Sequence, residues 1–110
     1  MKKRISIDFD GVIHIDPQRR YYNGSIQGEL AEGAYDALHR LAHNVHFQPY
    51  VLTARTDLEN VSSWIFQQTG LHLEVTNQKL PAVVYVDDRG FRFENNWPEV
   101  ISFIAKLQKD

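Results

Sequence analysis

The sequence predicts a single α/β domain, a Rossmann-like three-layer sandwich with a small parallel sheet between helices. Apolar strand patterns alternate with amphipathic helical patterns along the chain, which is typical of βαβ units and of a parallel sheet. The length of 110 residues suits one domain, 1–110, with little room for a second. Hydrophobic residues make up 43% of the chain and charged residues 24%, as in globular proteins that bury one core.

The composition also narrows the classes of partner. No apolar run reaches the roughly 20 residues that span a bilayer, and the N-terminal segment shows no apolar signal, so we expect a cytoplasmic protein with no membrane partner. The net charge of -2 gives no general attraction for nucleic acid. The chain has no cysteine, which excludes disulfides, thiolate nucleophiles and zinc–thiolate sites. Chemistry must therefore come from carboxylates, His, Lys and Thr.

The first three elements follow from periodicity. Apolar residues alternate with polar ones over 4–9, which predicts a strand that ends in acidic residues. A loop follows over 11–28, because this segment has turn signals and no sustained period. Apolar residues at helical spacing then predict an amphipathic helix over 32–44.

A second strand and helix follow. Residues 47–53 form a short strand, in which Pro49 is expected at the entry or on an unpaired side because it cannot donate to a ladder. Helical spacing predicts a helix over 57–69, with Asp57 as its N-cap and Gly70 as its end.

The last elements are two strands and a helix. Residues 71–75 are a weak strand, whereas 82–86 form a nearly continuous apolar run, typical of an inner strand covered on both faces. A helical stripe over 100–107 follows Pro98, which suits the first turn of a helix.

Polar side chains follow the predicted strands at one edge of the sheet. Asp8 and Asp10 come after the first strand, Thr53 closes the second, and Asp87 and Asp88 close the inner one. Ligands of open α/β sheets bind at the carboxyl ends of the strands. A single Asp there is more often a turn or cap residue, but several carboxylates together repel one another unless a cation is bound. Mg²⁺ prefers oxygen ligands and bridges carboxylates to phosphate, so these residues predict a magnesium site.

The same residues resemble the four motifs of the haloacid dehalogenase superfamily. ISIDFDGVI resembles the first motif and VLTAR the second, while Lys79 with VVYVDDR resembles the third and fourth. The motifs occur in order and cover residues 4 to 89. The gaps between them are too short for a cap domain, so the chain resembles the small capless members, with 11–30 as the turn-and-flap loop.

The resemblance implies a magnesium-dependent phosphatase that hydrolyses phosphate monoesters, small or macromolecular, through an aspartyl-phosphate. It makes Asp8 the nucleophile and Asp10 the general acid and then base, a role helped by a turn at Gly11. It also implies phosphate binding by Thr53, Ala54, Arg55 and Lys79, of which Thr53 and Lys79 are catalytic. Magnesium binding is implied for Asp8, Asp10 (through its backbone carbonyl), Asp87 and Asp88, and either Asp87 or Asp88 is the direct ligand.

Several alternatives stay open. A non-catalytic module of the same fold would bind magnesium and a phosphorylated ligand, although it would not need the acid Asp10. A phospho-accepting receiver domain also uses an acidic pair, Thr and Lys on a parallel sheet. Its acidic pair follows the first strand and its phospho-accepting Asp a middle strand, however, which is the reverse of the order here. Capless members use open sites, larger substrates or a neighbouring subunit as a lid, which leaves a homo-oligomer open.

Three charged or aromatic features near the site are ambiguous. Arg55 meets either a charged group of the substrate or one of two acidic residues, Asp57 or Asp88. The flap segment 19–22 either grips an anionic or ring-bearing leaving group or forms a solvated loop surface. His14, close to the acidic turn, is a candidate substrate contact.

Overall fold

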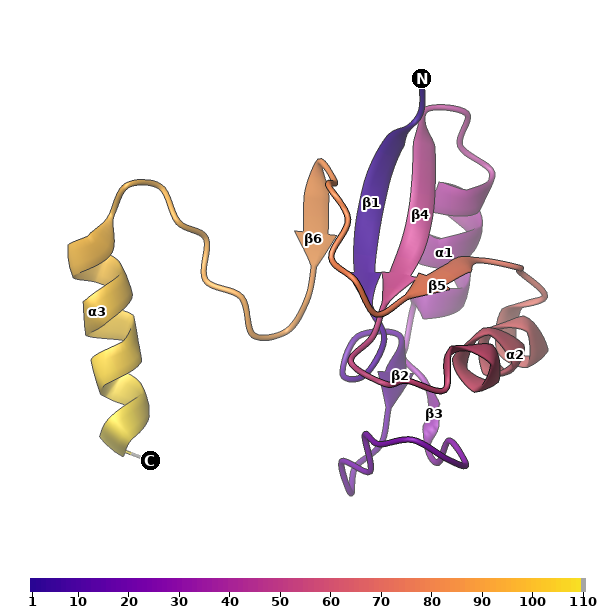
Figure 1. Ribbon diagram of the computed structural model, residues 1–110, viewed down its shortest axis with the longest axis horizontal. Helices are drawn as coiled ribbons and strands as arrows, with labels where there is room; N and C mark the ends of the chain where they lie inside the picture. The colour runs from indigo at the N-terminus through magenta and orange to yellow at the C-terminus, as the bar shows by residue number, and fades with distance from the viewer. Residues whose placement is uncertain (110) are drawn as a thin grey trace.

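A four-stranded parallel sheet forms the centre of the computed structural model, which describes residues 1–109 (Figure 1). Its strand order is β5-β4-β1-β6, and all three pairings are parallel. The parallel α/β sheet is therefore confirmed. The strands are β1 (Lys3–Asp8), β4 (Phe47–Leu52), β5 (Glu74–Thr76) and β6 (Val84–Val86).

Two helices cover one face of this sheet and form the core with it. These are α1 (Ala34–Ala42) and α2 (Leu58–Thr69), which begins after Asp57 and ends at Gly70 with a φ of 77°, as the sequence predicts. Asp57 holds the N-cap position, but its carboxylate accepts from the Gly24 amide and makes no cap hydrogen bond. Pro49 lies opposite Ile5 of β1 and is unpaired on its other side, because the pairing with β5 begins at Tyr50. This agrees with the prediction that Pro49 has an unpaired side. The core contains Ile5, Ile7, Phe9, Ile13, Leu38, Val51, Val61, Trp64 and Ile65.

The long loop after β1 contains a small antiparallel pair that the sequence pattern did not reveal. It consists of β2 (His14–Ile15) and β3 (Glu29–Leu30). Each strand has only two residues, too few for an alternating pattern to be visible in the sequence. The pair closes the loop upon itself, and its residue His14 and the preceding Ile13 are both buried.

Strand β6 is an edge strand, so the prediction of an inner strand covered on both faces is wrong. It pairs only with β1, and Val84 and Val86 keep 45% and 42% of their surface exposed. The segment 77–83 that leads into β6 contains no helix. The apolar run of β6 therefore lacks the helix that usually packs on a parallel strand.

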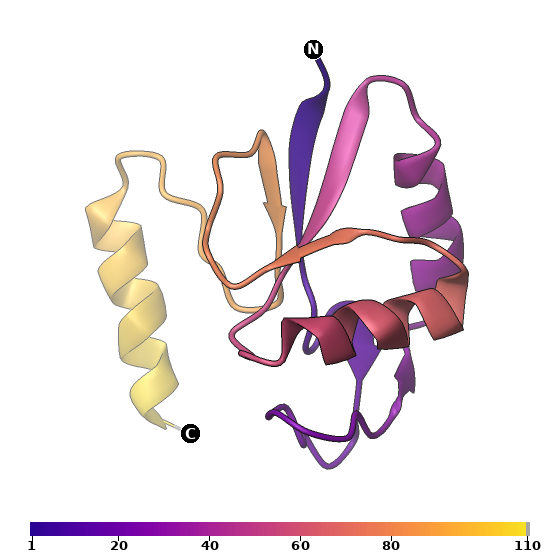
Figure 2. The ribbon, with the colours of Figure 1, turned by 45° about the vertical axis from the view of Figure 1, so that its right-hand side comes forward.

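The second helical layer of the predicted sandwich is also missing from the described range 1–109. Helix α3 (Trp97–Lys106), continued by the short 3₁₀ helix η1 (Leu107–Lys109), lies beyond β6 and has no buried residue (Figures 1 and 2). The sheet thus has helices on one face only, which corrects the three-layer expectation. Within the same range, no helix has the length and apolar character needed to cross a membrane.

Candidate functional site

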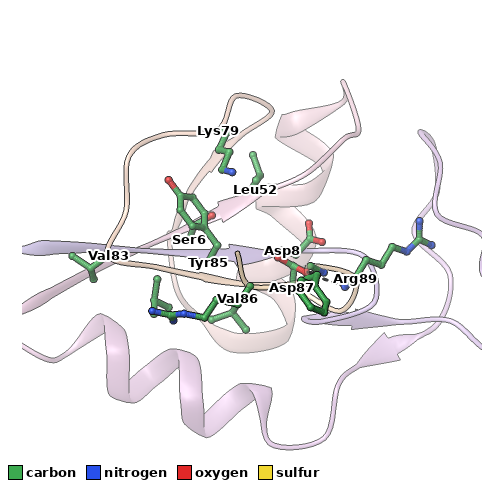
Figure 3. Close-up of a pocket in the computed structure, with 13 residues that line it drawn as sticks. Ser6, Asp8, Leu52, Lys79, Val83, Tyr85, Val86, Asp87 and Arg89 are labelled. Atoms are coloured by element: carbon green, nitrogen blue, oxygen red, sulfur yellow. Dashed lines mark hydrogen bonds between the residues drawn. The ribbon is translucent and has the colours of Figure 1, made fainter. Parts of the chain in front are cut away.

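The candidate site lies at the carboxyl ends of β1 and β6. The chain leaves β1 toward β4 and β5 on one side and returns to β6 on the other, so the order of the strands reverses here. Crevices at such reversal points are the usual ligand sites of open α/β sheets. An open pocket of about 600 Å³ lies at this point, and Asp8, Asp87 and Lys79 line it (Figure 3).

Asp8 is half-buried at the end of β1 and is surrounded by other carboxylates. Burial raises the pKa of its side chain, and the negative charges of Asp88, Asp87 and Asp10 raise it further, in that order. A hydrogen bond from the Phe9 amide acts in the opposite direction. The acidic residues that the sequence placed at one edge are thus close enough to repel Asp8.

The turn after β1 brings its acidic residues together. The carbonyl of Phe9 accepts hydrogen bonds from the amides of Ile13 and His14 at 3.0 and 2.9 Å, which reverses the chain. Gly11 has a φ of +87°, and a Cβ placed there would lie 2.5 Å from Oδ2 of Asp88. Gly11 therefore supplies both the left-handed backbone and the space that the Asp88 carboxylate occupies.

Asp10 is held in a network rather than exposed to the pocket. Nε of Arg55 donates to its Oδ2 at 3.0 Å and Nη2 donates to its Oδ1 at 2.9 Å, a bidentate pair. Nδ1 of His14 also lies 3.1 Å from Oδ1. The side chain of Arg55 is only 2% exposed, so its partner is Asp10 and not Asp57 or Asp88, the two acidic residues named from the sequence.

Thr53 and Ala54 follow β4 beside this network. Thr53 is buried, and its hydroxyl oxygen accepts a hydrogen bond from the amide of Arg55 at 3.1 Å, so the hydroxyl proton remains available to another acceptor. Ala54 is exposed. The two residues therefore border the site near Asp10, while Leu52 is the residue of β4 that lines the pocket itself.

Lys79 reaches the pocket from the segment before β6. Its ammonium lies 4.6 Å from the centroid of the Tyr85 ring, a cation–π arrangement. Figure 3 shows it at the end of the pocket marked by Tyr85 and Leu52, away from Asp8 and Asp87. The structure thus brings Lys79 and Asp8 to one pocket, with the positive charge at the far end.

The acidic residues after β6 lie near Asp8, and Asp87 lines the same pocket. Oδ1 of Asp87 accepts hydrogen bonds from the amides of Arg89, at 2.9 Å, and Gly90. In the range 1–109 no three ligating side chains are gathered tightly enough to hold a metal by themselves. Magnesium commonly uses only one or two carboxylates, together with waters and phosphate oxygens. The mutual repulsion at Asp8 fits such an ion, with Asp8 and Asp87 as its carboxylates.

The flap loop is built by internal contacts that the sequence analysis missed. Arg20 forms a bidentate pair with Asp16, with Nε 2.7 Å from Oδ2, and this pair lowers the pKa of the buried Asp16 carboxyl. His14 is fully buried, stacked on Phe9, and its Nε2 bonds to the carbonyl of Gln27. Both residues thus support the loop, where the sequence offered them as substrate contacts. Their i, i+4 spacing from an aspartate was the available signal.

No family model, curated protein or solved structure matches this chain. The assignment of a function therefore depends on the geometry of the pocket and on the motifs in the sequence.

Proposed function

We propose that this chain is a magnesium-dependent phosphatase that hydrolyses phosphate monoesters through an aspartyl-phosphate formed on Asp8. The observation that carries the proposal is the position of Asp8, at the reversal point of the parallel sheet and on the wall of a pocket shared with Asp87 and Lys79. The resemblance of the sequence to capless haloacid dehalogenase members supports the choice of reaction.

The reaction would need two displacements at phosphorus. A carboxylate oxygen of Asp8 attacks the phosphorus as the ester P–O bond breaks, and a protonated Asp10 would give its proton to the leaving oxygen, which departs as the alcohol. Water then attacks the same phosphorus and gives a proton back to Asp10, the P–O bond to Asp8 breaks, and phosphate is released. The Thr53 hydroxyl, which borders the site near Asp10, and the Lys79 ammonium would stabilise the phosphoryl oxygens, and for this the Lys79 side chain would have to leave the Tyr85 ring and extend toward Asp8.

Asp8 and Asp87 are the side chains suited to hold magnesium, with Asp88 next to them behind Gly11. The bound ion would neutralise the charge of the phosphoryl group. It would also relieve the repulsion from Asp88 and Asp87, which is the next largest cause of the raised pKa of Asp8 after burial. The acidic cluster therefore has a use in the proposed reaction that a purely structural cluster would lack.

Asp10 is the residue that favours a second candidate function. Both of its oxygens accept hydrogen bonds, from Arg55 and from the ring of His14 if Nδ1 carries the proton. To protonate a leaving group, Asp10 must first be released from Arg55. A protein that only binds magnesium and a phosphorylated ligand has no such requirement, so the network supports a non-catalytic module of the same fold as the alternative.

The deciding experiment measures release of inorganic phosphate from p-nitrophenyl phosphate and from a panel of phosphate monoesters, with and without Mg²⁺. A phosphatase should turn over only with Mg²⁺, and Asp8→Asn should reduce turnover to background. Asp36→Asn, an exposed change on α1, is the matched control and should leave turnover intact. Turnover that survives Asp8→Asn would exclude the nucleophile. Mg²⁺-dependent binding of phosphate without any turnover would favour the binding module.

A further inference from the structure

The C-terminal part of the chain has two apolar surfaces that no other part of residues 1–109 covers. The first is the apolar stripe of α3, whose members Trp97, Ile101 and Ile104 are 63%, 60% and 50% exposed. The second, which we call the β6 face, consists of Val84 and Val86. These two residues pair in register with Ile5 and Ile7 of β1 and so point to the core side of the sheet. The β6 face is therefore an uncovered continuation of the hydrophobic core.

Helix α3 does not lie on the sheet of its own chain. Residues 87–109, here called the arm, lead away from β6, and both ribbon views show α3 standing apart from the sheet (Figures 1 and 2). Rings of the connecting segment pack on the helix instead. The centroids of Phe91 and Phe103 are 5.0 Å apart, and those of Phe93 and Trp97 are 5.1 Å apart. The arm is thus a small unit that presents its apolar stripe outward.

The solvent-accessible area of the chain is larger than that of a compact protein of the same mass. A folded monomer of 12.8 kDa exposes roughly 6,300 Å², whereas this chain exposes 7929 Å². The radius of gyration is 15.4 Å, against about 13 Å for a compact domain of this length. The excess of roughly 1,600 Å² per chain is about twice the roughly 800 Å² per partner that a standard protein interface buries.

We infer that two copies of this chain exchange arms, so that α3 of each copy packs on the β6 face of the other. A second copy supplies both missing surfaces at once, a helix for the strand and a strand for the helix, in a two-fold arrangement. The excess area of two chains comes to roughly 3,300 Å², within the range of obligate homodimers. Ser6 and Asp8 alternate with Ile5 and Ile7 along β1 and so point away from this contact, but Val84 and Val86 also line the pocket. Helix α3 of the second copy would therefore border the pocket. The inference does not depend on the proposed phosphatase activity.

The first test is the molar mass of the full chain in solution, measured by sedimentation equilibrium. The wild type should be a dimer at micromolar concentration. Ile101→Glu with Ile104→Glu places two charges on the apolar stripe and should raise the dissociation constant by roughly 100-fold or more. Val45→Glu, at an apolar residue that is 74% exposed outside the arm, should leave the dimer unchanged. A monomeric wild type, or a dimer that resists the double change, would overturn the inference.

The second test distinguishes exchange from other uses of the arm. Since the chain has no cysteine, any disulfide must form between engineered residues. Single variants Val84→Cys and Ile104→Cys, refolded together and oxidised, should give a disulfide between the two different chains. If the chain with both changes gives a monomer with an internal disulfide, the arm covers its own sheet and the inference is wrong. If Ile104→Cys links only to itself, the helices pair with each other and exchange is excluded as well.

Discussion

Residues 1–76 and residues 77–109 contain the same kinds of element but differ in what those elements bury. In the first region α1 and α2 pack on β1 and β4, and Val51 and Ile65 are completely buried. In the second region β6 and α3 have apolar sequences as well, yet neither has a buried residue. An amphipathic pattern therefore predicts that a helix or strand forms, but burial also requires a surface within reach.

Replacing one aromatic residue in each region by alanine should give the largest difference in the loss of unfolding free energy. Phe9 is fully buried against His14 and Trp64, so Phe9→Ala should lower the free energy of unfolding by about 3–5 kcal/mol. Phe103 is 42% exposed, so Phe103→Ala should cost less than about 1.5 kcal/mol in dilute protein. Urea denaturation followed by circular dichroism measures both. Equal losses would mean that the arm is buried even in the single chain.

The ion pairs of the two regions should differ in the same direction. Arg55 is 2% exposed and bidentate on Asp10, so Arg55→Met should cost about 3 kcal/mol because it leaves a largely buried carboxylate without its partner. Arg92 and Glu94 are 86% and 65% exposed, so Arg92→Met should change stability by less than about 1 kcal/mol although the atoms lie 2.8 Å apart. The free energies of unfolding, measured at low and high salt, provide the check. Salt should weaken the effect of Arg92→Met more than that of Arg55→Met.

The sequence predicted well whatever depends on local pattern and on topology. The strands of the parallel sheet and the two helices of the first region, the Asp57 start and Gly70 end of α2, and the meeting of Asp8 with Asp87 at one sheet edge follow from periodicity and from the parallel arrangement, whereas the two-residue strands β2 and β3 do not. The partner of Arg55 did not follow, because Asp10 is 45 residues distant and three acidic side chains competed for the same guanidinium. The edge position of β6 depends on which strand it pairs with, which an apolar run does not encode.

Gly11 and Gly33 provide a smaller comparison, between a glycine that touches the second region and one that does not. Both have a positive φ, +87° and +81°, so alanine at either should cost about 1–2 kcal/mol of backbone strain. At Gly11 the new Cβ would also meet Asp88, whereas at Gly33 nothing lies within 4 Å. Gly11→Ala should therefore be the more destabilising in urea denaturation. Equal effects would indicate that Asp88 does not remain beside the turn.

The smallest expected effect is a pH dependence at Asp8. Because the folded pKa of Asp8 is raised above 3.8, the unfolded chain loses this proton first, and the stability contribution of Asp8 falls as pH rises from 3.8 through the folded pKa. In metal-free buffer Asp8→Asn should therefore stabilise the chain at pH 7 and have little effect at pH 3. Asp16, whose pKa is lowered by Arg20, has the opposite sign, so Asp16→Asn should destabilise at pH 7.

The origin of the Asp8 shift allows this measurement to report on the contact between the two regions. Burial is its largest cause and belongs to the first region, but Asp88 and Asp87, the next two causes, belong to the second. In a background with Asp87→Asn and Asp88→Asn, the stabilisation by Asp8→Asn at pH 7 should shrink to the part that burial produces. If the stabilisation is unchanged in that background, the carboxylates after β6 do not lie beside Asp8 in solution. The acidic pocket on which the proposed function depends would then not exist.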